Sequence, residues 1–496
     1  MITETIWHFI GGRQARSSLA KTFAVADPAT GKEYARVEVG LGADVNQAVL
    51  AARAAFTEGP WPGMAAPDRA GVLNLIAAGI ESRADEIAGL EALCTGLPVT
   101  QARKLAVLAA GHFRLAADAI TAGRDDAAFV PGRPGCPVRR PAGVAGVLTS
   151  WRTPFLAQAR AVAPALAAGC TVVLQTDPWT PLSAALLPDL TTGAGLPDGV
   201  LNIVHGTGDW RGRGAGTEAR DALIAHPGVP LLALAGDAAT GDQAAREAAA
   251  RGKRLSADLA GNSPCLIFAD AHLDRAVDSA AFGAFALNGG RRTAASRILA
   301  ERPVYDAIVA RLAEVAARIR VGDPADPATE LGPLAHRELC DRAMTWVRLG
   351  LREDARLAAG GRRTADRAEG NYLSATVLAD VTPEMRIFAE VIGGPVACVT
   401  PFDTEQEAVT AANAANTTNG ANGANTAAPA AYIWTSDPRR ARRLAPAIDS
   451  PAVWVNAHNP DDLRTVGGGG DGTDFYTRYS TVHIAADDGP APRLGD

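Results

Sequence analysis

Apolar residues recur every three or four positions in two segments near the N-terminus, as they do on the buried face of a helix. The first stripe consists of Val45, Ala48, Val49, Ala52 and Phe56. The second stripe consists of Val72, Leu73, Ile76 and Ile80. Asp44 stands immediately before the first stripe, where a carboxylate caps a helix well. The pattern therefore predicts two amphipathic helices.

Short apolar runs of four or five residues follow further along the chain and predict buried strands. These runs are residues 144–148, 171–174, 200–204, 231–234, 255–259 and 265–268. Helical stretches separate several of them, as parallel strand–helix–strand crossovers require. We therefore expect an α/β protein built on parallel sheets.

Gly236 and Gly241 enclose a short segment between a predicted strand and a predicted helix. A dinucleotide phosphate could meet the helix N-terminus there. Two glycines are a weak signal, and a plain tight turn is the more common interpretation.

Residues 411–431 form a tract of Ala, Asn, Thr and Gly with a single proline and no charge. Such a segment has little apolar surface to bury, so the tract predicts a surface loop.

Composition and charge narrow the classes of function that the protein can have. The chain has 496 residues and a net charge of −6, which gives no basic surface for nucleic acid. The N-terminus lacks a signal-peptide pattern, and no run of about eighteen uncharged apolar residues suggests a membrane span. Six cysteines are scattered without a C-x-x-C pair, so we expect free thiols, no metal site and a cytoplasmic protein.

Several motifs occur in an order that is typical of one family. Residues 9–12 and 27–31 are similar to F-I-N-G and N-P-A-T-G, and residues 141–154 to P-x-G-V-x-G-V-I-T-P-W-N-F-P. Residues 285–297 are similar to F-x-N-x-G-Q-x-C-x-A-x-S-R without a gap. The chain thus resembles the aldehyde dehydrogenase superfamily over nearly its whole length.

The resemblance implies an architecture. It places a Rossmann-type cofactor domain in residues 1–121 and 142–259, and a catalytic-type α/β domain in residues 260–463. Residues 122–141 and 464–496 would form a small β oligomerisation arm. A homo-oligomer, either a dimer or a tetramer, is therefore expected, and another enzyme or an intact paralogue is a further candidate partner.

The residues that the family uses for chemistry differ here. The family's cysteine attacks the aldehyde to form a thiohemiacetal, a nicotinamide takes the hydride, and a glutamate activates cysteine or water. In this chain Arg292 stands at the cysteine, Arg152 at the oxyanion-stabilising asparagine and Asp258 at the glutamate. A guanidinium stays protonated and has no lone pair for a carbonyl carbon, so we predict that the thioester route is lost.

The cofactor positions have also changed. The positions that the family motifs assign to NAD(P) correspond here to Trp151, Gln175, Gly236, Asp237, Gly241 and Val391. Gln175 replaces a lysine, Val391 a carboxylate with Glu390 one place earlier, and Asp237 a serine close to the pyrophosphate. A carboxylate at Asp237 caps the helix but repels phosphate, which argues against NAD(P) binding.

Two interpretations of the site remain open. Arg292 and Arg152 should approach one another in the family geometry, and Asp258 with Glu390 would neutralise them in a salt-bridged cavity. Alternatively Arg152, Arg292 and Arg291 grip a small anionic ligand.

Three further residues are candidates for the same region of the chain. The side chains of His458 and Thr293 would add polar lining, although neither has an adjacent partner that would make a nucleophile–base pair. Cys265 would be a core residue rather than a displaced nucleophile.

Two classes of function follow. The first is a pseudoenzyme with an assembly, partner or ligand-binding role. The second is a repurposed enzyme with an arginine-lined anion pocket and Asp258 as base, or a residual NAD(P)-linked oxidoreductase.

Overall fold

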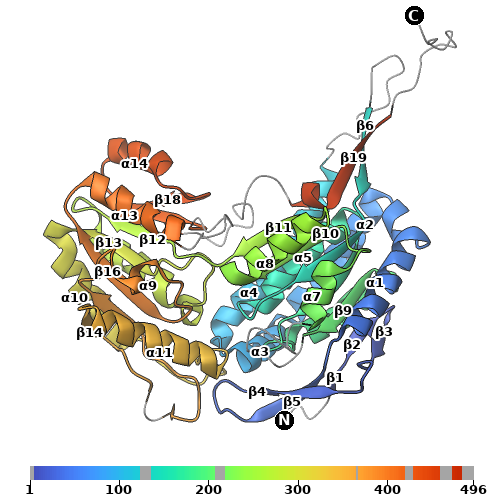
Figure 1. Cartoon of the computed structure of the whole chain (residues 1–496), viewed down its shortest axis with the longest axis horizontal. Helices are drawn as coiled ribbons and strands as arrows, with labels where there is room; N and C mark the ends of the chain where they lie inside the picture. Colours follow the sequence, from blue (N-terminus) through green and yellow to red (C-terminus); the bar gives the residue numbers. More distant parts are fainter. Residues whose placement is uncertain are drawn as a thin grey trace, which may run out of the picture.

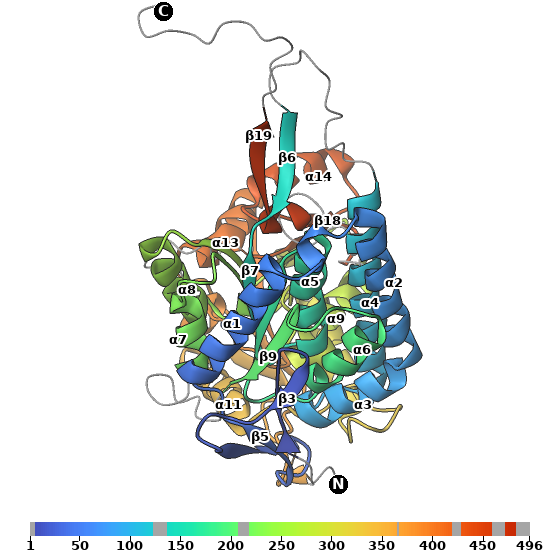
Figure 2. The ribbon, with the colours of Figure 1, turned by 90° about the vertical axis from the view of Figure 1, so that its right-hand side faces the viewer.

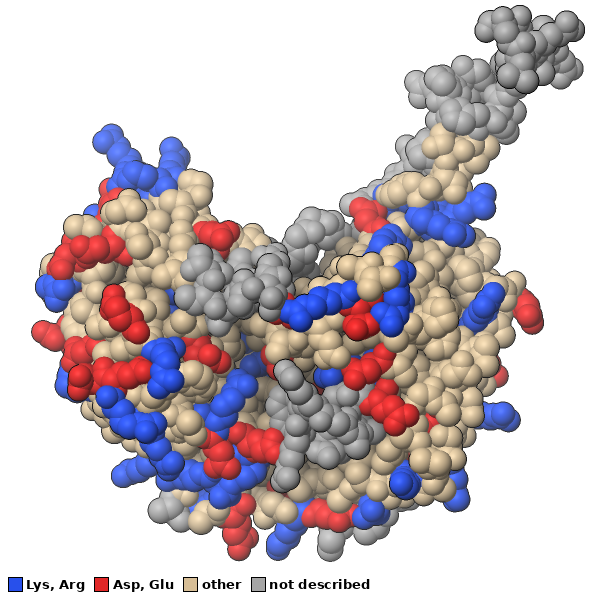
Figure 3. All heavy atoms as spheres, in the orientation of Figure 1, with Lys and Arg blue, Asp and Glu red and all other residues tan. Residues whose placement is uncertain are grey.

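The computed structural model describes residues 5–122, 136–206, 218–364, 367–418, 428–458 and 472–482. Within these ranges the chain forms two lobes, each built on a seven-stranded sheet, with a two-stranded arm that extends from the first lobe (Figure 1). Acidic and basic side chains are interspersed over the face in Figure 3, in keeping with the small net charge.

The sheet of the first lobe has the order β11-β10-β7-β8-β9-β2-β3. Its strands are β2 (His8–Ile10), β3 (Arg13–Ala15), β7 (Val144–Leu148), β8 (Thr171–Thr176), β9 (Leu201–His205), β10 (Leu231–Gly236) and β11 (Arg254–Leu259). Strands β7 to β11 run parallel, whereas β2 and β3 pair antiparallel at one edge. Both faces of the central strands are apolar because helices cover both sides.

Alternate residues of the same strand enter different cores. Val144 and Leu148 of β7 join one hydrophobic cluster, whereas Ala145 and Val147 join another. Figure 2 shows the two helical layers that cover these faces. One layer contains α1 (Gly42–Thr57), α7 (Glu218–Ala225) and α8 (Ala238–Ala250). The other contains α2 (Ala66–Ser82), α3 (Ala84–Thr95), α4 (Val99–Thr121), α5 (Pro154–Ala167) and α6 (Leu187–Gly193).

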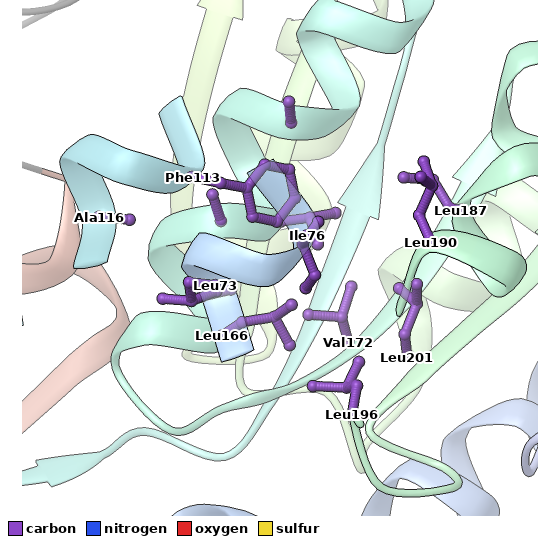
Figure 4. Close-up of a cluster of buried hydrophobic side chains, with 14 of the residues drawn as sticks. Leu73, Ile76, Phe113, Ala116, Leu166, Val172, Leu187, Leu190, Leu196 and Leu201 are labelled. Atoms are coloured by element: carbon purple, nitrogen blue, oxygen red, sulfur yellow. The ribbon is translucent and has the colours of Figure 1, made fainter. Parts of the chain in front are cut away.

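Figure 4 shows the core that contains Ala145 and Val147. Leu73 and Ile76 of α2 meet Phe113 of α4, Leu166 of α5 and Val172 of β8, and all five are almost fully buried. Each fully buried aliphatic or aromatic side chain contributes on the order of 1.5–3 kcal/mol. This packing holds helix α5, and with it one wall of the site described below, against the sheet.

The second lobe has the sheet order β14-β15-β16-β13-β12-β17-β18. Its strands are β12 (Pro264–Ile267), β13 (Arg297–Glu301), β14 (Arg356–Ala359), β15 (Thr376–Ala379), β16 (Val396–Phe402), β17 (Ala431–Trp434) and β18 (Val453–Val455). Its helices are α9 (Leu273–Phe285), α10 (Arg302–Arg318), α11 (Arg337–Arg352), α12 (Arg386–Ala389), α13 (Glu405–Thr418) and α14 (Pro438–Leu444). Separate hydrophobic clusters lie on the two faces of this sheet as well.

The described residues also form two smaller sheets. Strands β1 (Thr5–Ile6), β4 (Thr22–Ala26) and β5 (Glu33–Glu38) form a three-stranded sheet near the N-terminus. Strands β6 (Cys136–Pro141) and β19 (Thr477–Val482) pair antiparallel and project from the body, as Figures 1 and 2 both show. Over the described residues, no helix combines the length and the apolar composition needed to cross a membrane.

Most of the predicted elements are found. All six apolar runs lie in β7 to β12, with ends that differ by one or two residues, and the two helical stripes lie on α1 and α2. Asp44 acts as a cap from the third position of α1 rather than before it, since its Oδ2 accepts the backbone N–H of Leu41 at 3.0 Å.

The expected loop at residues 411–431 is wrong at both ends. Residues 411–418 continue helix α13, and Ala431 begins β17. Alanine favours a helix and Ala411 and Ala412 bury their methyl groups, so the first third of the tract extends the helix that precedes it. Residues 419–427 lie outside the described residues.

Candidate ligand-binding site

The candidate residues gather where the two lobes meet, at the carboxyl ends of the parallel strands of the first lobe. Arg152 follows β7, Asp237 follows β10, and Asp258 is the penultimate residue of β11. Ligands of open α/β sheets bind at this edge, because the loops after the strands converge there. The second lobe contributes the loop between α9 and β13, which carries Arg292.

The loop that carries Arg292 is held in a strained conformation. Leu287 and Asn288 both have positive φ, 54° and 55°, which costs a non-glycine residue on the order of 1 kcal/mol or more. Asn288 offsets this strain: its Nδ2 donates to the carbonyls of Gly96 and Pro333, both at 2.9 Å. Because Gly96 belongs to the first lobe, these bonds also tie the two lobes together.

Gly289 continues the same loop, with φ at 72°. A Cβ at this position would lie 2.2 Å from the backbone of Gly394. Only glycine fits so close an approach, so the loop is fixed against the neighbouring backbone just before Arg291 and Arg292.

The structure joins Arg292 to Asp258. The Nε of Arg292 lies 3.0 Å from Oδ1 of Asp258, and Nη1 of Arg160 lies 2.9 Å from its Oδ2. The three side chains are partly buried, with 24%, 32% and 22% of the surfaces of Arg292, Asp258 and Arg160 exposed. One carboxylate therefore faces two guanidinium groups, one at each oxygen.

Arg160 is a residue that sequence reasoning missed. It is the only charged residue of helix α5, which is otherwise apolar apart from Gln158. A lone charge in such a helix is a usable signal, because a buried charge requires a partner. Burial lowers the pKa of Arg160, and Asp258 opposes that shift. Burial, and then the charge of Arg160 nearby, lower the pKa of His112 of α4 to about 3.

Arg152 faces different groups from Arg292. Its guanidinium carbon lies 4.5 Å from the centre of the Trp151 ring, and a Cβ on Gly393 would lie 3.2 Å from its Nη2. Burial and then Arg342 lower the pKa of Arg152 to about 10, while Asp237 opposes them. The structure therefore places Arg152 toward the Asp237 side, and the two arginines do not share the Asp258 carboxylate.

Asp237 is the N-cap of helix α8. Its Oδ1 accepts the backbone N–H of Thr240 at 2.8 Å, so the interpretation of Asp237 as a cap is confirmed. Asp177 lies close by, and its Oδ1 accepts the backbone N–H of Trp179 at 2.9 Å. Burial, with a smaller contribution from Asp237, raises the pKa of Asp177 to about 7. The helix N-terminus is thus lined by two carboxyl groups.

The other residues that the motifs predict at cofactor positions are also engaged within the chain. Gln175 is buried in β8, and its side-chain amide donates to the carbonyl of Thr176. Val391 presents an apolar side chain, and its carbonyl accepts from Nη2 of Arg342 at 3.0 Å. Burial raises the pKa of Glu390 and Arg342 opposes it. Among the residues that the structure describes, no group of three or more His, Cys, Asp or Glu side chains is placed to hold a metal ion.

An aromatic cluster that no sequence motif indicates lies beside Arg152. Trp179 stacks on His336 with ring centres 4.3 Å apart at 14°, and Trp151 meets His336 edge-on at 6.1 Å. Nδ1 of His336 accepts the backbone N–H of Leu339 at 3.2 Å. Burial, then Arg342 and Arg152, lower the pKa of His336 to about 3, so this ring is neutral. The tryptophans and the histidine lie far apart in the sequence, and no local pattern links them.

The remaining candidates gather around the rings of Tyr432 and Phe282. His458 stacks on Tyr432 at 4.4 Å and 3°, and its Nδ1 lies 3.0 Å from Oγ of Ser279. The carbonyl of Thr293 accepts from the Tyr432 hydroxyl at 3.0 Å. The guanidinium of Arg291 lies 4.8 Å from the Phe282 ring centre. Arg291 and Arg292, although adjacent, therefore have different surroundings.

Cys265 is a core residue, as expected. It is fully buried in β12, and burial raises its pKa to about 12. The other cysteines with described side chains, Cys94, Cys170, Cys340 and Cys398, are also buried, and burial raises the pKa of each thiol.

Comparison with known proteins identifies the family. The model of the aldehyde dehydrogenase family matches residues 15–480, so the chain belongs to this family. It is 37% identical over 474 residues to the 5-carboxymethyl-2-hydroxymuconate semialdehyde dehydrogenase of Escherichia coli, covering 93% of this chain and 95% of that protein.

Solved structures agree with this assignment. The crystal structure of HpcC from Thermus thermophilus superposes with a TM-score of 0.89 at 38% identity, over 99% of this chain and 95% of that one. A cysteine-to-alanine mutant of aldehyde dehydrogenase C from Pseudomonas syringae, solved with NAD+ and octanal, gives 0.86 at 32% identity over 96% of both chains. The predicted α/β aldehyde dehydrogenase fold is therefore confirmed.

Proposed function

We propose that this member of the aldehyde dehydrogenase family has lost cysteine-dependent aldehyde oxidation and acts by binding a ligand or a partner. The ion pair between Arg292 and Asp258 carries the proposal. By the motif match, Arg292 and Asp258 correspond to the family's nucleophile and general base, so a protonated guanidinium and its counter-ion would occupy these two positions. Neither group can attack a carbonyl carbon in this state, because the guanidinium has no free lone pair and the carboxylate is engaged on both oxygens.

The described thiols supply no substitute nucleophile. A thiolate is the reactive form of cysteine, and burial disfavours it. Cys265 and Cys398 have pKa values of about 12, and Cys170 about 11, so each is a neutral thiol near pH 7. None of these three side chains is exposed to an incoming aldehyde.

The residues at the cofactor positions fit a pyrophosphate poorly. Asp237 already caps helix α8, where a phosphate would otherwise accept the same N–H groups, and Asp177 adds a second carboxyl group. At an effective dielectric near 20, two unit charges about 4 Å apart repel by ~4 kcal/mol. Val391 offers no carboxylate to a ribose, and the Gln175 amide is bonded to its own backbone. We therefore propose that NAD(P) binds weakly or not at all.

A binding role without turnover is consistent with the fold. The cysteine-to-alanine mutant from Pseudomonas syringae was solved with both NAD+ and octanal, so that relative holds ligands without the replaced cysteine. In the present chain the arm formed by β6 and β19 offers backbone edges for assembly, and we propose a homo-oligomer, a dimer or tetramer. Another enzyme or an intact paralogue would use the same surface.

The test is an assay for acyl transfer. The purified chain is incubated with the semialdehyde of the Escherichia coli relative and with NAD+ or NADP+, and that relative serves as the positive control. We expect no reduced nicotinamide and no mass increase on the polypeptide. A covalent acyl adduct that forms with nicotinamide reduction would overturn the proposal. Co-purification from native lysate then tests for a partner.

A second candidate is a repurposed enzyme that uses Asp258 as a base, or a residual NAD(P)-linked oxidoreductase. The similarity to a semialdehyde dehydrogenase over 93% of the chain favours it, as does the partial exposure of Asp258. Calorimetric titration with NAD+ and NADP+ separates the oxidoreductase from the roles without redox chemistry. Micromolar binding supports an oxidoreductase, and no binding supports a non-redox role.

A further inference from the structure

The cluster of Arg160, Asp258 and Arg292 has an excess of positive charge. Two guanidinium groups, those of Arg160 and Arg292, share the one carboxylate of Asp258. Arg337 and Arg363 share Asp341 in the same way, but that carboxylate is 59% exposed, against 32% for Asp258. The cluster therefore has a net charge of about +1 when all three groups are ionised.

The neighbouring histidine does not add a counter-charge. His112 lies beside Arg160 on the adjacent helix α4, and it is neutral because burial and Arg160 disfavour its protonated form. A neutral imidazole can accept or donate one hydrogen bond but cannot balance a cation. The remaining positive charge is available to a ligand.

The geometry also leaves donors for a second anion. Each guanidinium has five N–H groups in a planar fork that matches the two oxygens of a carboxylate. Arg292 approaches Asp258 most closely through Nε, and Arg160 does so through Nη1. The other nitrogens of each guanidinium group lie farther from the Asp258 carboxylate. All three side chains retain between a fifth and a third of their exposure, so solvent reaches the cluster.

We propose that this cluster is a binding site for a small carboxylate. The ligand would be held by Arg160 and Arg292, with Asp258 as an internal carboxylate that holds the two guanidinium groups in place and competes with the ligand for their N–H groups. A carboxylate is the ligand proposed because Asp258 already shows that two oxygens of this spacing span the two cations, and because the planar fork of a guanidinium matches a planar carboxylate. The inference extends the proposed function but does not require it, since binding involves no redox step.

The experiment measures acetate binding to the full-length protein by ligand-observed NMR, with no aldehyde or nicotinamide present. Arg160→Met and Arg292→Met should each weaken binding at least tenfold, and Asp258→Asn should strengthen it at least tenfold because the competing charge is removed. Asp403→Asn is the matched control: it removes the carboxylate partner of a single surface arginine, Arg302, and should leave the acetate affinity unchanged.

Two results would overturn the proposal. One is acetate affinity that is equal in the wild-type protein and both methionine variants. The other is equal affinity for acetate, chloride and phosphate, which would show attraction of any anion. If a methionine variant fails to fold, Arg160→Lys and Arg292→Lys keep the charge but lose the fork, and an undiminished affinity in both would also contradict the proposal. Because redox turnover is assayed separately, failure here is distinguishable from failure of the proposed function.

Discussion

The Nε of Arg292 lies 3.0 Å from Oδ1 of Asp258, while the other oxygen of Asp258 is 2.9 Å from Arg160. This arrangement changes what a single substitution can achieve. Replacing Arg292 removes one cation and leaves Asp258 paired with Arg160, so the site does not lose its only ion pair. Whether aldehyde oxidation is restored then depends on the surrounding residues.

Arg292→Cys should therefore restore little aldehyde oxidation. The new thiol would face the ion pair of Asp258 and Arg160, whose opposite charges offset one another. Arg152 would remain directed toward Asp237 and Arg342 instead of stabilising an oxyanion. Loss of one oxyanion donor alone costs about 10²–10³-fold in rate. We expect nicotinamide reduction at least that far below the Escherichia coli relative assayed in parallel.

Alkylation with iodoacetamide provides the control for this variant. Modification of one additional cysteine, without nicotinamide reduction, would show that the thiol is present and reactive but insufficient. Turnover close to that of the relative would show that the positions around Arg292 are still competent.

Asp237→Ser should improve NAD(P) binding without loss of stability. Serine caps a helix about as well as aspartate, so the free energy of unfolding should change by only a few tenths of a kcal/mol. Removal of a charge near the proposed phosphate position should raise affinity by about tenfold or more, as measured by titration with nicotinamide fluorescence.

Asp437→Ser is the matched control for this prediction. Asp437 caps helix α14 in the same way, accepting the backbone N–H of Arg439 at 2.8 Å, but lies in the second lobe. If both serine variants change NAD(P) affinity equally, or neither changes it, Asp237 is not what weakens binding.

The fold was largely predictable because its signals are local. Runs such as Val144–Leu148 are buried on both faces, and their continuous apolar sequence predicts a strand regardless of the neighbouring residues. The cap at Asp237 was predictable for the same reason, since a cap depends on a few successive residues. The helical part of the tract after Ala411 was missed because alanine is compatible with both loop and helix, and the decision depends on packing against β12 and β16.

The partners within the site were less predictable because they depend on side-chain direction. The sequence identified Arg152, Arg292 and Asp258, but it did not show that Arg152 faces Arg342 and Asp237 while Arg160 pairs with Asp258. Similarly, the stacking of Trp179 on His336 joins residues from both lobes. Such pairs follow from the way the lobes meet, which no local pattern encodes.

Arg297→Leu should destabilise the second lobe by roughly 3–5 kcal/mol. Arg297 is 1% exposed and donates to three backbone carbonyls: that of Asn262, at 2.9 Å from Nη2, and those of Ala411 and Ala412. Burial lowers the pKa of Arg297 to about 9, so it remains a cation at pH 7. Leucine would leave these carbonyls buried without donors.

Urea unfolding measures this loss. The control is Arg302→Leu, which removes an exposed arginine that pairs with Asp403 and should shift the urea midpoint far less than Arg297→Leu does. Equal midpoints for the two variants would mean that the carbonyls around Arg297 find other donors.

Stability should decrease as the pH falls below about 6.5, and His8 should contribute to that decrease. His8 is fully buried, and its Nδ1 accepts the backbone N–H of His205 at 3.2 Å, so it must be neutral on that nitrogen. Burial lowers its pKa to about 4. The unfolded chain therefore binds a proton between pH 6.5 and about 4 that the folded chain does not, and folding loses about 1.4 kcal/mol per pH unit over this window.

The His8→Asn variant tests this assignment, because the amide oxygen can accept from His205 but does not titrate. Its free energy of unfolding is measured in urea from pH 7 to pH 5. The slope of this free energy against pH should be smaller than that of the wild-type protein, by the equivalent of about one bound proton. His272→Asn removes an exposed imidazole and should leave the slope unchanged. A wild-type slope in the His8 variant would mean that other groups, such as the buried His205 whose pKa is about 3, carry the whole dependence.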